Sequence, residues 1–277
     1  LPRNKRMILW TNFRWRSAIM TAVENAHAGE PYEQYTPSFA EYWDDLVGWD
    51  DRLERDGPFY ERLMRAHGAK DVADIATGTG VNGVALALAG FNVTATDGSE
   101  NMLIKARENA KARGASFVDS WVADWLTLDE TLGKEQYDAL VCLGNSFTHL
   151  FDHEQRRDAL HAMFRTLRPG GMLIIDHRNY DTMLDEGYSS KHAYNYCGDD
   201  VDVGPAQLHR RLAQFHYKFK DGSTFQLNMY PLRQDYVTHL LEDAGFVNVQ
   251  RYGDMQRPFI LNQVDFIQQV AFRPPEE

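Results

Sequence analysis

The sequence predicts an α/β fold: a doubly wound, seven-stranded and mostly parallel sheet, with an antiparallel flap inserted after its fifth strand and an N-terminal lid. Three observations support this prediction. Short apolar runs alternate with segments of helical spacing, which is typical of parallel strands joined by helices. The run D-V-A-D-I-A-T-G-T-G-V-N-G at 71–83 reads as a strand, a glycine turn and a helix start. Between 188 and 230 the alternation stops, and period-two segments flank an Asp221-Gly222 turn.

Composition excludes several classes of protein. The 277 residues are 43% apolar and 12% aromatic, which suits one domain with a sizeable core. The formal net charge of −11 argues against sequence-independent nucleic-acid binding, because phosphates need a basic face. No apolar run approaches the ~20 residues that span a bilayer, so no membrane association is expected. Two cysteines, Cys142 and Cys197, give no disulfide framework and favour a reducing compartment, the cytoplasm.

The N-terminal part divides into two segments. Residues 1–20 carry basic residues without an acidic one, and 1–30 are expected to form a peripheral arm that is mobile or not native. Residues 31–68 are dense in aromatic and charged side chains, and a helix is predicted at 59–67. The aromatics either staple an N-terminal helix to the core or fold over a ligand as a lid.

Residues 31–277 are expected to form one domain. It consists of the lid at 31–68, a cofactor-binding core at 69–177, a substrate flap at 178–232 and a closing helix and strands at 233–273. Core strands are predicted at 71–76, 91–96, 116–122, 137–143 and 172–176, and helices at 81–89, 99–113 and 154–167. Ser99 is a candidate N-cap, and Pro169-Gly170-Gly171 should end the last helix. Flap strands are predicted at 212–219 and 225–229, then a helix at 233–245 and strands at 247–252 and 264–272.

The glycine turn after the first strand is a candidate ligand-binding loop. Glycine permits positive φ and close approach of a ligand, and the following helix N-terminus favours a polar group. Asp97 closes the second strand, where a carboxylate can accept both hydroxyls of a ribose. Gly78-x-Gly80-x-x-Gly83 also fits the dinucleotide fingerprint, and a glycine turn can simply join a strand to a helix. The residues therefore indicate an adenosine-type ligand without identifying it.

Polar residues also follow the other predicted strands, and ligands of open α/β sheets bind outside the carboxyl ends of strands. Asp124 and Trp125 follow the third strand; they either bracket an adenine or form an ordinary helix cap. Residues 144–149 follow the fourth strand and 177–181 the fifth. No metal site is predicted, because His149 and His153 have helical spacing but no third ligand nearby.

Together these features resemble the class I fold of S-adenosylmethionine-dependent methyltransferases. L-G-N-S-F-T-H-L at 143–150, D-H-R-N-Y-D at 176–181 and A-D-W at 123–125 look like the glycine N-methyltransferase family. G-Y-S-S-K-H-A-Y-N-Y-C-G-D at 187–199 and L-N-M-Y-P-L-R at 227–233 resemble its bacterial glycine/sarcosine N-methyltransferase branch, which makes the osmoprotectant betaine. The resemblance runs from about residue 32 to about residue 254.

The resemblance implies S-adenosyl-L-methionine as cofactor and S-adenosyl-L-homocysteine as product. It implies that Tyr35, Trp43 and Arg52 reach the methionine end from the lid, with Arg55 as an alternative to Arg52. The implied cofactor-binding residues are Tyr35, Trp43, Arg52, Ala76, Gly78, Gly80, Asp97, Ser99, Met102, Asp124, Trp125 and Leu143. The residues implied to hold the amino acid, or to lie near it, are Asn145, Arg178, Tyr196, Tyr230 and His149.

The implied reaction is in-line methylation of glycine, sarcosine or both at the neutral amine. A sulfonium methyl is already activated, so the transfer needs position and a dry cavity more than acid–base groups. Arg178 can anchor the substrate carboxylate with two parallel hydrogen bonds, or it can form a surface salt bridge. Tyr196 and Tyr230 either orient the amine or pack the flap, and His149 is either a proton relay or structural.

Three other functions remain open from the sequence. A methyltransferase of the same fold could act on dimethylglycine or another small amine. A nicotinamide-dependent dehydrogenase could use the glycine fingerprint, although Asp74 within the strand and Asp124-Trp125 weigh against it. A cofactor-binding sensor without turnover is the third. The expected partner is a small amino acid, with no nucleic acid and no membrane, and the chain is either a monomer or a homo-oligomer.

Overall fold

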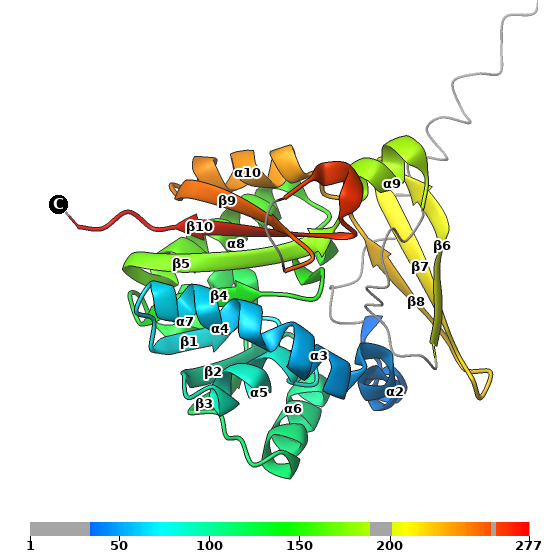
Figure 1. The fold of residues 1–277 in the computed structure, drawn as a ribbon, viewed down its shortest axis with the longest axis horizontal. Coiled ribbons are helices and arrows are strands. Elements are labelled where there is room, and N and C mark those ends of the chain that lie inside the picture. Colours follow the sequence, from blue (N-terminus) through cyan, green and yellow to red (C-terminus); the bar gives the residue numbers. More distant parts are fainter. Residues whose placement is uncertain (1–33, 189–200, 256–258, 277) are drawn as a thin grey trace, which may run out of the picture.

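The computed structural model describes residues 34–188, 201–255 and 259–276 (Figure 1). Its main sheet has seven strands in the order β3-β2-β1-β4-β5-β10-β9. These strands are β1 Asp71–Asp74, β2 Asn92–Asp97, β3 Asp119–Val122, β4 Tyr137–Cys142, β5 Leu167–Arg178, β9 Val247–Gly253 and β10 Phe266–Phe272. Strands β1 to β5 pair in parallel, whereas β10 runs antiparallel to both β5 and β9. The predicted α/β fold class is confirmed.

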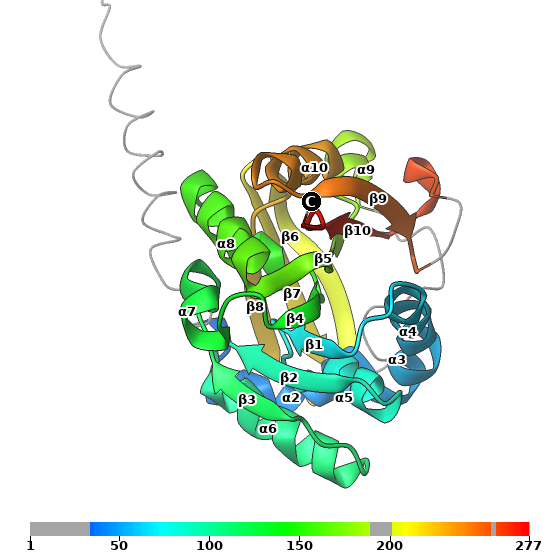
Figure 2. The same cartoon turned by 90° about the vertical axis from the view of Figure 1, so that its left-hand side faces the viewer.

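Helices cover both faces of this sheet, as Figure 2 shows. One face carries α4 Gly57–Ala66, α5 Val81–Leu88 and α6 Glu100–Ala112, and the other carries α7 Leu128–Leu132, α8 His153–Thr166 and α10 Gln234–Asp243. Neighbouring strand residues alternate between the faces: Val72 packs in the core under α4 and α5, and Ala73 in the core under α8 and α10. Three short 3-10 helices complete the described core: η2 Trp125–Thr127, η3 Ser146–His149 and η4 Leu261–Gln263.

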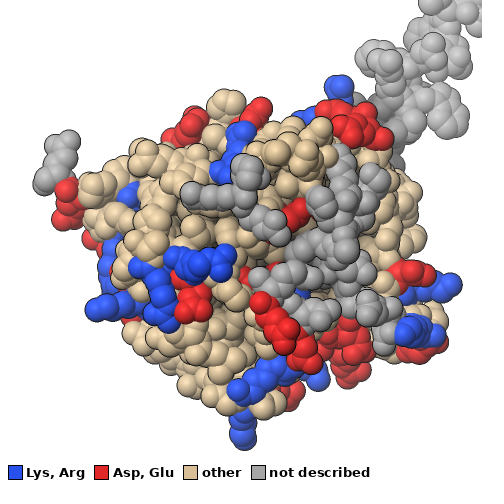
Figure 3. All heavy atoms as spheres, viewed as in Figure 1, with Lys and Arg blue, Asp and Glu red and all other residues tan. Residues whose placement is uncertain are grey.

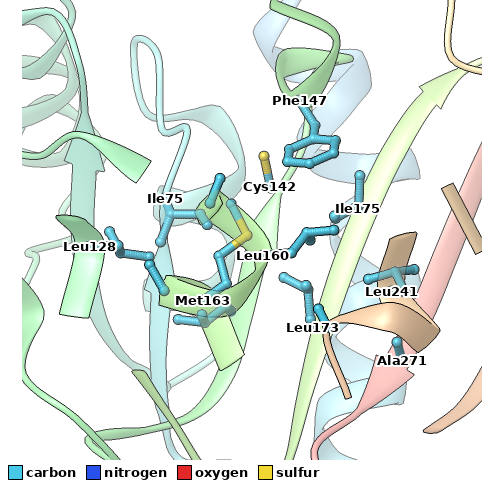
Figure 4. Packing of buried hydrophobic residues seen from close by; sticks show 14 of the residues in the cluster. Ile75, Leu128, Cys142, Phe147, Leu160, Met163, Leu173, Ile175, Leu241 and Ala271 are labelled. Carbon is cyan, nitrogen blue, oxygen red and sulfur yellow. The ribbon is translucent and has the colours of Figure 1, made fainter. Parts of the chain in front are cut away.

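The core under α8 is continuous and apolar (Figure 4). Leu160 and Met163 of α8 pack with Ile75, Leu173 and other buried side chains of the strands. Cys142 is fully buried in this cluster, as expected for a packing residue. Burial of each large aliphatic side chain stabilises the fold by about 1.5–3 kcal/mol. This core therefore holds the strands in place and, with them, the carboxyl ends at which the site lies.

The flap is a separate antiparallel sheet beyond the carboxyl ends of the parallel strands (Figure 1). It consists of β6 Val201–His209, β7 Leu212–Phe219 and β8 Thr224–Met229. The lid helices α2 Pro37–Val47 and α3 Trp49–Arg55 and the short α9 Tyr180–Glu186 complete the described elements. Phe39 of α2 is fully buried and stacks on Phe225 of β8 with ring centroids 4.4 Å apart. The Tyr42 hydroxyl donates to Asp221 Oδ2 over 2.6 Å. Lid and flap therefore pack against each other.

Several element predictions were wrong or incomplete. Strand β5 begins at Leu167, not Met172, because Leu167 pairs with Tyr137 and the Pro-Gly-Gly run continues the strand with Gly170 at φ +80°. β6, α7 and α9 were not predicted. Gly204 and Pro205 argue against a strand, yet β6 is an edge strand where a missing N–H is tolerated. The predicted arm at 1–30 lies outside the described residues, and the domain boundaries stay predictions.

On the face shown in Figure 3, acidic and basic side chains are interspersed. Within the three described ranges, no helix combines the length and the apolar character that crossing a membrane requires.

Gly80 should be a structural glycine. It has φ +101°, and a Cβ there would lie 3.1 Å from Ala106 Cα of α6. Gly90 has a similar φ of +91° but open space around it. Both Ala variants should lose about 1 kcal/mol to the left-handed backbone. Gly80→Ala should lose roughly a further 1–3 kcal/mol to the clash. Urea unfolding measures both losses, and equal losses would show that α5 does not depend on this close approach.

Candidate active site

A cavity of about 410 Å³ lies at the carboxyl ends of β1, β2 and β4, under the lid. Its volume is typical of a small-molecule site. The predicted residues that line it are Tyr35, Trp43, Arg52, Ala76, Gly78, Asp97, Met102, Asp124, Trp125, Leu143 and His149. Gly144 and Ser146 also line it, within the range 144–149 that was expected near a ligand. The other lining residues were not predicted: Val47, Ile75, Thr77, Val81, Asn82, Gly98, Val122, Ala123, Leu126, Leu150 and Gln155.

Asp97 ties the glycine loop to the end of β2. Its Oδ2 accepts from the Gly78 N–H and its Oδ1 from the Ser99 N–H, both over 2.9 Å. Burial raises the pKa of Asp97 to about 6, against these hydrogen bonds. Ser99 caps α6 through the Met102 N–H, as predicted, and does not line the cavity. Its contact with the ligand region therefore runs through Asp97.

Asp74, the last residue of β1, also holds the glycine loop. Its carboxylate accepts from the Thr77 hydroxyl over 3.2 Å and from the Ala76 N–H over 3.4 Å, and burial raises its pKa to about 7. Gly78 has φ +54°, and a Cβ there would lie 3.3 Å from Trp43 Nε1. Only glycine thus leaves this wall of the cavity open. Gly80 faces Ala106 instead, so its predicted role toward the cofactor stays a prediction.

For Asp124 and Trp125 the helix-cap interpretation is confirmed, and the adenine role stays a prediction. Asp124 Oδ1 accepts from the Leu126 N–H over 2.9 Å and so caps η2, while the residue also lines the cavity. The Trp125 indole N–H donates to the Ile75 carbonyl over 2.6 Å, which fixes the ring at the cavity wall. With Leu143 and Met102, the wall combines apolar surface with one carboxylate.

On the lid side, Tyr35 and His149 are joined by a 2.7 Å hydrogen bond between the hydroxyl and Nε2. The Gln34 Oε1 accepts from the Asn228 N–H over 2.7 Å, which fixes the orientation of the Gln34 amide. Its Nε2 donates to the Asn228 carbonyl over 3.3 Å and lies 3.4 Å from His149 Nδ1, so both ring nitrogens of His149 have a polar neighbour. Burial lowers the pKa of His149 to about 4. A neutral imidazole with both nitrogens engaged favours a structural role over a proton relay.

Arg52 of α3 is buried and also lines the cavity. Its Nε donates to Asp56 Oδ2 over 3.0 Å, and Asp56 is buried as well. Burial raises the pKa of Asp176 to about 6, although the Asn145 N–H and the nearby charge of Arg52 act against that rise. The side chain of Arg55, the alternative to Arg52, lies outside the described residues.

Asn145 and Arg178 form a buried pair beside the cavity. Asn145 has φ +63°; its N–H donates to Asp176 Oδ1 over 2.7 Å and its Oδ1 accepts from the Arg178 N–H over 3.0 Å. Its Nδ2 donates to the Tyr180 hydroxyl over 2.9 Å. Neither Asn145 nor Arg178 lines the cavity, but Gly144 and Ser146 on either side of Asn145 do. The Asn145–Arg178 pair therefore lies next to the cavity wall that Gly144 and Ser146 form.

The two predicted tyrosines have different outcomes. Tyr196 lies outside the described residues. Tyr230 does not line the cavity: the guanidinium of Arg156 lies 4.4 Å from its ring centroid, and Phe151 packs edge-on against it. A role for either tyrosine toward the substrate stays a prediction. Within the described part of the chain, no group of three or more His, Cys, Asp or Glu residues is placed to hold a metal ion.

Sequence reasoning missed two kinds of site residue. Asp176 and Tyr180 flank Arg178 at the end of β5; the range 177–181 was expected near the site, but neither residue was assigned a role. Gln34 and Gln155 reach the site from distant segments, and nothing in their local sequence indicates it.

The buried His149 should make the protein sensitive to acid. Its folded pKa of about 4 lies below the usual 6.5, so its share of stability is present above pH 6.5 and lost as pH falls toward 4. At pH 5 the loss should be roughly 2 kcal/mol. Unfolding of wild type and His149→Gln at pH 7.5 and pH 5 measures this share. The exposed His153, substituted in the same way, is the control; identical pH dependence of all three proteins would contradict the burial of a neutral imidazole.

Comparison with known proteins agrees with this geometry. A family profile described as "Methyltransferase domain" matches residues 72–171. An S-adenosylmethionine-dependent methyltransferase from Clostridium acetobutylicum has a similar structure, with a TM-score of 0.69 at 18% identity over 86% of this chain and 98% of that chain. Such a likeness shows the class I methyltransferase fold.

Curated relatives are much closer in sequence. The glycine/sarcosine N-methyltransferases of Aphanothece halophytica and Halorhodospira halochloris are 45% and 44% identical to this chain, over 86% of it and 89% and 88% of their lengths. A glycine/sarcosine/dimethylglycine N-methyltransferase of Actinopolyspora halophila is 44% identical over 86% of this chain, but the match covers 42% of that longer protein. The chain therefore belongs to the glycine/sarcosine N-methyltransferase family.

Proposed function

We propose that this protein transfers the methyl group of S-adenosyl-L-methionine to the amino nitrogen of glycine and sarcosine. The observation that carries the proposal is the buried Asn145–Arg178 pair, which begins at the wall of a cavity suited to an adenosine-type cofactor. The family of the chain supports the same reaction.

The residues of the cavity fit the cofactor. Gly78 leaves space that a Cβ would fill, and Asp97 presents a fixed carboxylate suited to ribose hydroxyls. Asp124 and Trp125 offer an acceptor and an aromatic surface suited to adenine. Tyr35 and Trp43 offer aromatic surface at the lid, which favours a positively charged sulfur. When bound, S-adenosyl-L-methionine supplies an activated methyl group.

The protein's own contribution is position and exclusion of water. We propose that Arg178 binds the substrate carboxylate through its planar fork of N–H donors, and that Asn145 holds the Arg178 backbone in place. The lid, attached to the flap through Tyr42 and Asp221, keeps water out of the cavity. We assign no obligatory general base: the substrate reacts as its neutral amine, methyl transfer gives an ammonium product and S-adenosyl-L-homocysteine, and the ammonium loses its proton to bulk water after release.

A methyl-acceptor assay tests the function. Glycine, sarcosine and dimethylglycine are each offered with S-adenosyl-L-methionine, and products are identified by mass. Methylation of glycine and sarcosine is expected. Methylation of dimethylglycine alone would assign the chain to the alternative substrate, and no turnover with intact S-adenosyl-L-homocysteine binding would identify a sensor. Calorimetric titration should show binding of S-adenosyl-L-homocysteine and none of NAD; the reverse would identify a dehydrogenase.

Arg178 should decide amino-acid affinity. Arg178→Lys keeps the charge but loses the two-pronged contact, and should raise the KM for glycine about 10–100-fold. Affinity for S-adenosyl-L-homocysteine should not change, because Arg178 does not line the cofactor cavity. Arg157→Lys, at an exposed ion pair on α8, is the control. An unchanged KM in Arg178→Lys would remove Arg178 from substrate binding.

A further inference from the structure

Two phenylalanines flank the guanidinium of Arg178. The guanidinium carbon lies 4.6 Å from the ring centroid of Phe215 and 5.1 Å from that of Phe266. Phe215 belongs to β7 of the flap, and Phe266 lies on β10 directly opposite Arg178 in the sheet register. Both rings are buried, and Arg178 itself is only 8% exposed.

We propose that Phe215 and Phe266 are positioning residues for substrate recognition: their rings hold the guanidinium so that its N–H edge faces the amino-acid carboxylate. This inference rests on the proposed role of Arg178. Aromatic rings attract a cation through their negative faces, and the attraction grows when the cation is desolvated. A guanidinium covered on its faces keeps its in-plane donors for a carboxylate, which approaches in that plane.

The backbone of Arg178 is held independently of its side chain. Its N–H donates to Asn145 Oδ1 over 3.0 Å, and its carbonyl accepts from His177 Nδ1 over 2.9 Å. His177 Nε2 then accepts from Gln269 Nε2 over 3.2 Å, which is consistent with this tautomer. Asn145 and His177 contact only the backbone of Arg178, whereas the two rings contact the guanidinium itself.

The two rings come from different layers. Phe266 is part of the main sheet, whereas Phe215 belongs to the buried cluster that joins the flap to the lid, together with Phe39 and Leu227. The guanidinium therefore has its full orientation only when the flap is seated on the sheet. This arrangement links affinity for the amino acid, rather than for the cofactor, to the position of the flap.

Leucine variants test the rings by removing aromaticity while keeping apolar volume. Phe215→Leu and Phe266→Leu should each raise the KM for glycine about tenfold with little change in kcat, because a contact of equal strength in ground and transition states is lost. Affinity for S-adenosyl-L-homocysteine, measured by calorimetry, should stay at the wild-type value. Phe246→Leu, in the core between α8 and β9, is the matched control, and its KM should not change.

Fluorinated phenylalanines separate orientation from packing and also serve if a leucine variant fails to fold. Site-specific incorporation of mono-, di- and trifluorophenylalanine at 215 or 266 keeps the shape of the ring and progressively weakens its negative face. The KM for glycine should rise with each added fluorine, by about tenfold at three, and should stay flat for the same series at 246.

The outcomes separate this inference from the proposed function. A flat series at 215 and 266, with a raised KM in Arg178→Lys, would overturn the positioning role and leave Arg178 as the carboxylate anchor. A flat series together with an unchanged KM in Arg178→Lys would overturn both. An equal loss of S-adenosyl-L-homocysteine affinity in the 215 and 266 series would show that the rings only support the fold.

Discussion

Three aspartates at strand ends, the fully buried Asp74 and Asp176 and the partly buried Asp97, hold the loops on which the site depends. Asp74 ends β1, Asp97 ends β2, and Asp176 lies near the end of β5. Each accepts a hydrogen bond from a backbone N–H of a loop at the site: those of Ala76, of Gly78 and Ser99, and of Asn145 respectively. Where the loops leave the sheet, these N–H groups have no partner strand. Without the aspartates each would be a buried donor without a hydrogen bond, at a cost of about 1–3 kcal/mol.

The same hydrogen bonds explain how the three carboxylates can lie away from bulk water. Burial raises the pKa of Asp74 to about 7 and that of Asp97 and Asp176 to about 6, so ionising them is unfavourable compared with water. The hydrogen bonds from the loops partly offset that penalty. Site and fold are therefore coupled: the same contacts that shape the cavity also satisfy the buried charge. The lid and flap then cover the open side, and apolar and aromatic packing joins them.

The cavity and Arg178 lie on different sides of one short segment. Gly144 and Ser146 face the cavity, and Asn145 between them turns away toward Asp176, Tyr180 and Arg178. The left-handed conformation of Asn145 makes this reversal possible, and hydrogen bonds with Asp176, Tyr180 and Arg178 are among those that maintain it. A strained backbone conformation persists only where its surroundings determine it so fully. One residue thereby separates the cavity from Arg178 while keeping the two adjacent.

The sequence by itself determined the sheet, its helical covering and the position of the cavity at the strand ends. Glycines and acids placed directly after apolar runs report where parallel strands end, and those ends must meet at one edge of the sheet. It also determined the hairpin, because Asp221-Gly222 between alternating segments is a local signal. Pattern failed for β6, where Gly204 and Pro205 pair with β7, and for the start of β5, where Leu167 pairs with Tyr137 ahead of the Pro-Gly-Gly run.

Only the tertiary structure decided which side chains meet across these elements. Gly78 and Gly80 look equivalent in sequence. In the structure, Gly78 leaves space at the cavity wall beside Trp43, whereas Gly80 allows Ala106 of α6 to pack closely against the loop. Tyr230 packs on Arg156, and Arg178 lies between rings from β7 and β10. Such contacts join residues far apart along the chain, so they depend on how the sheets pack and leave no local pattern to read.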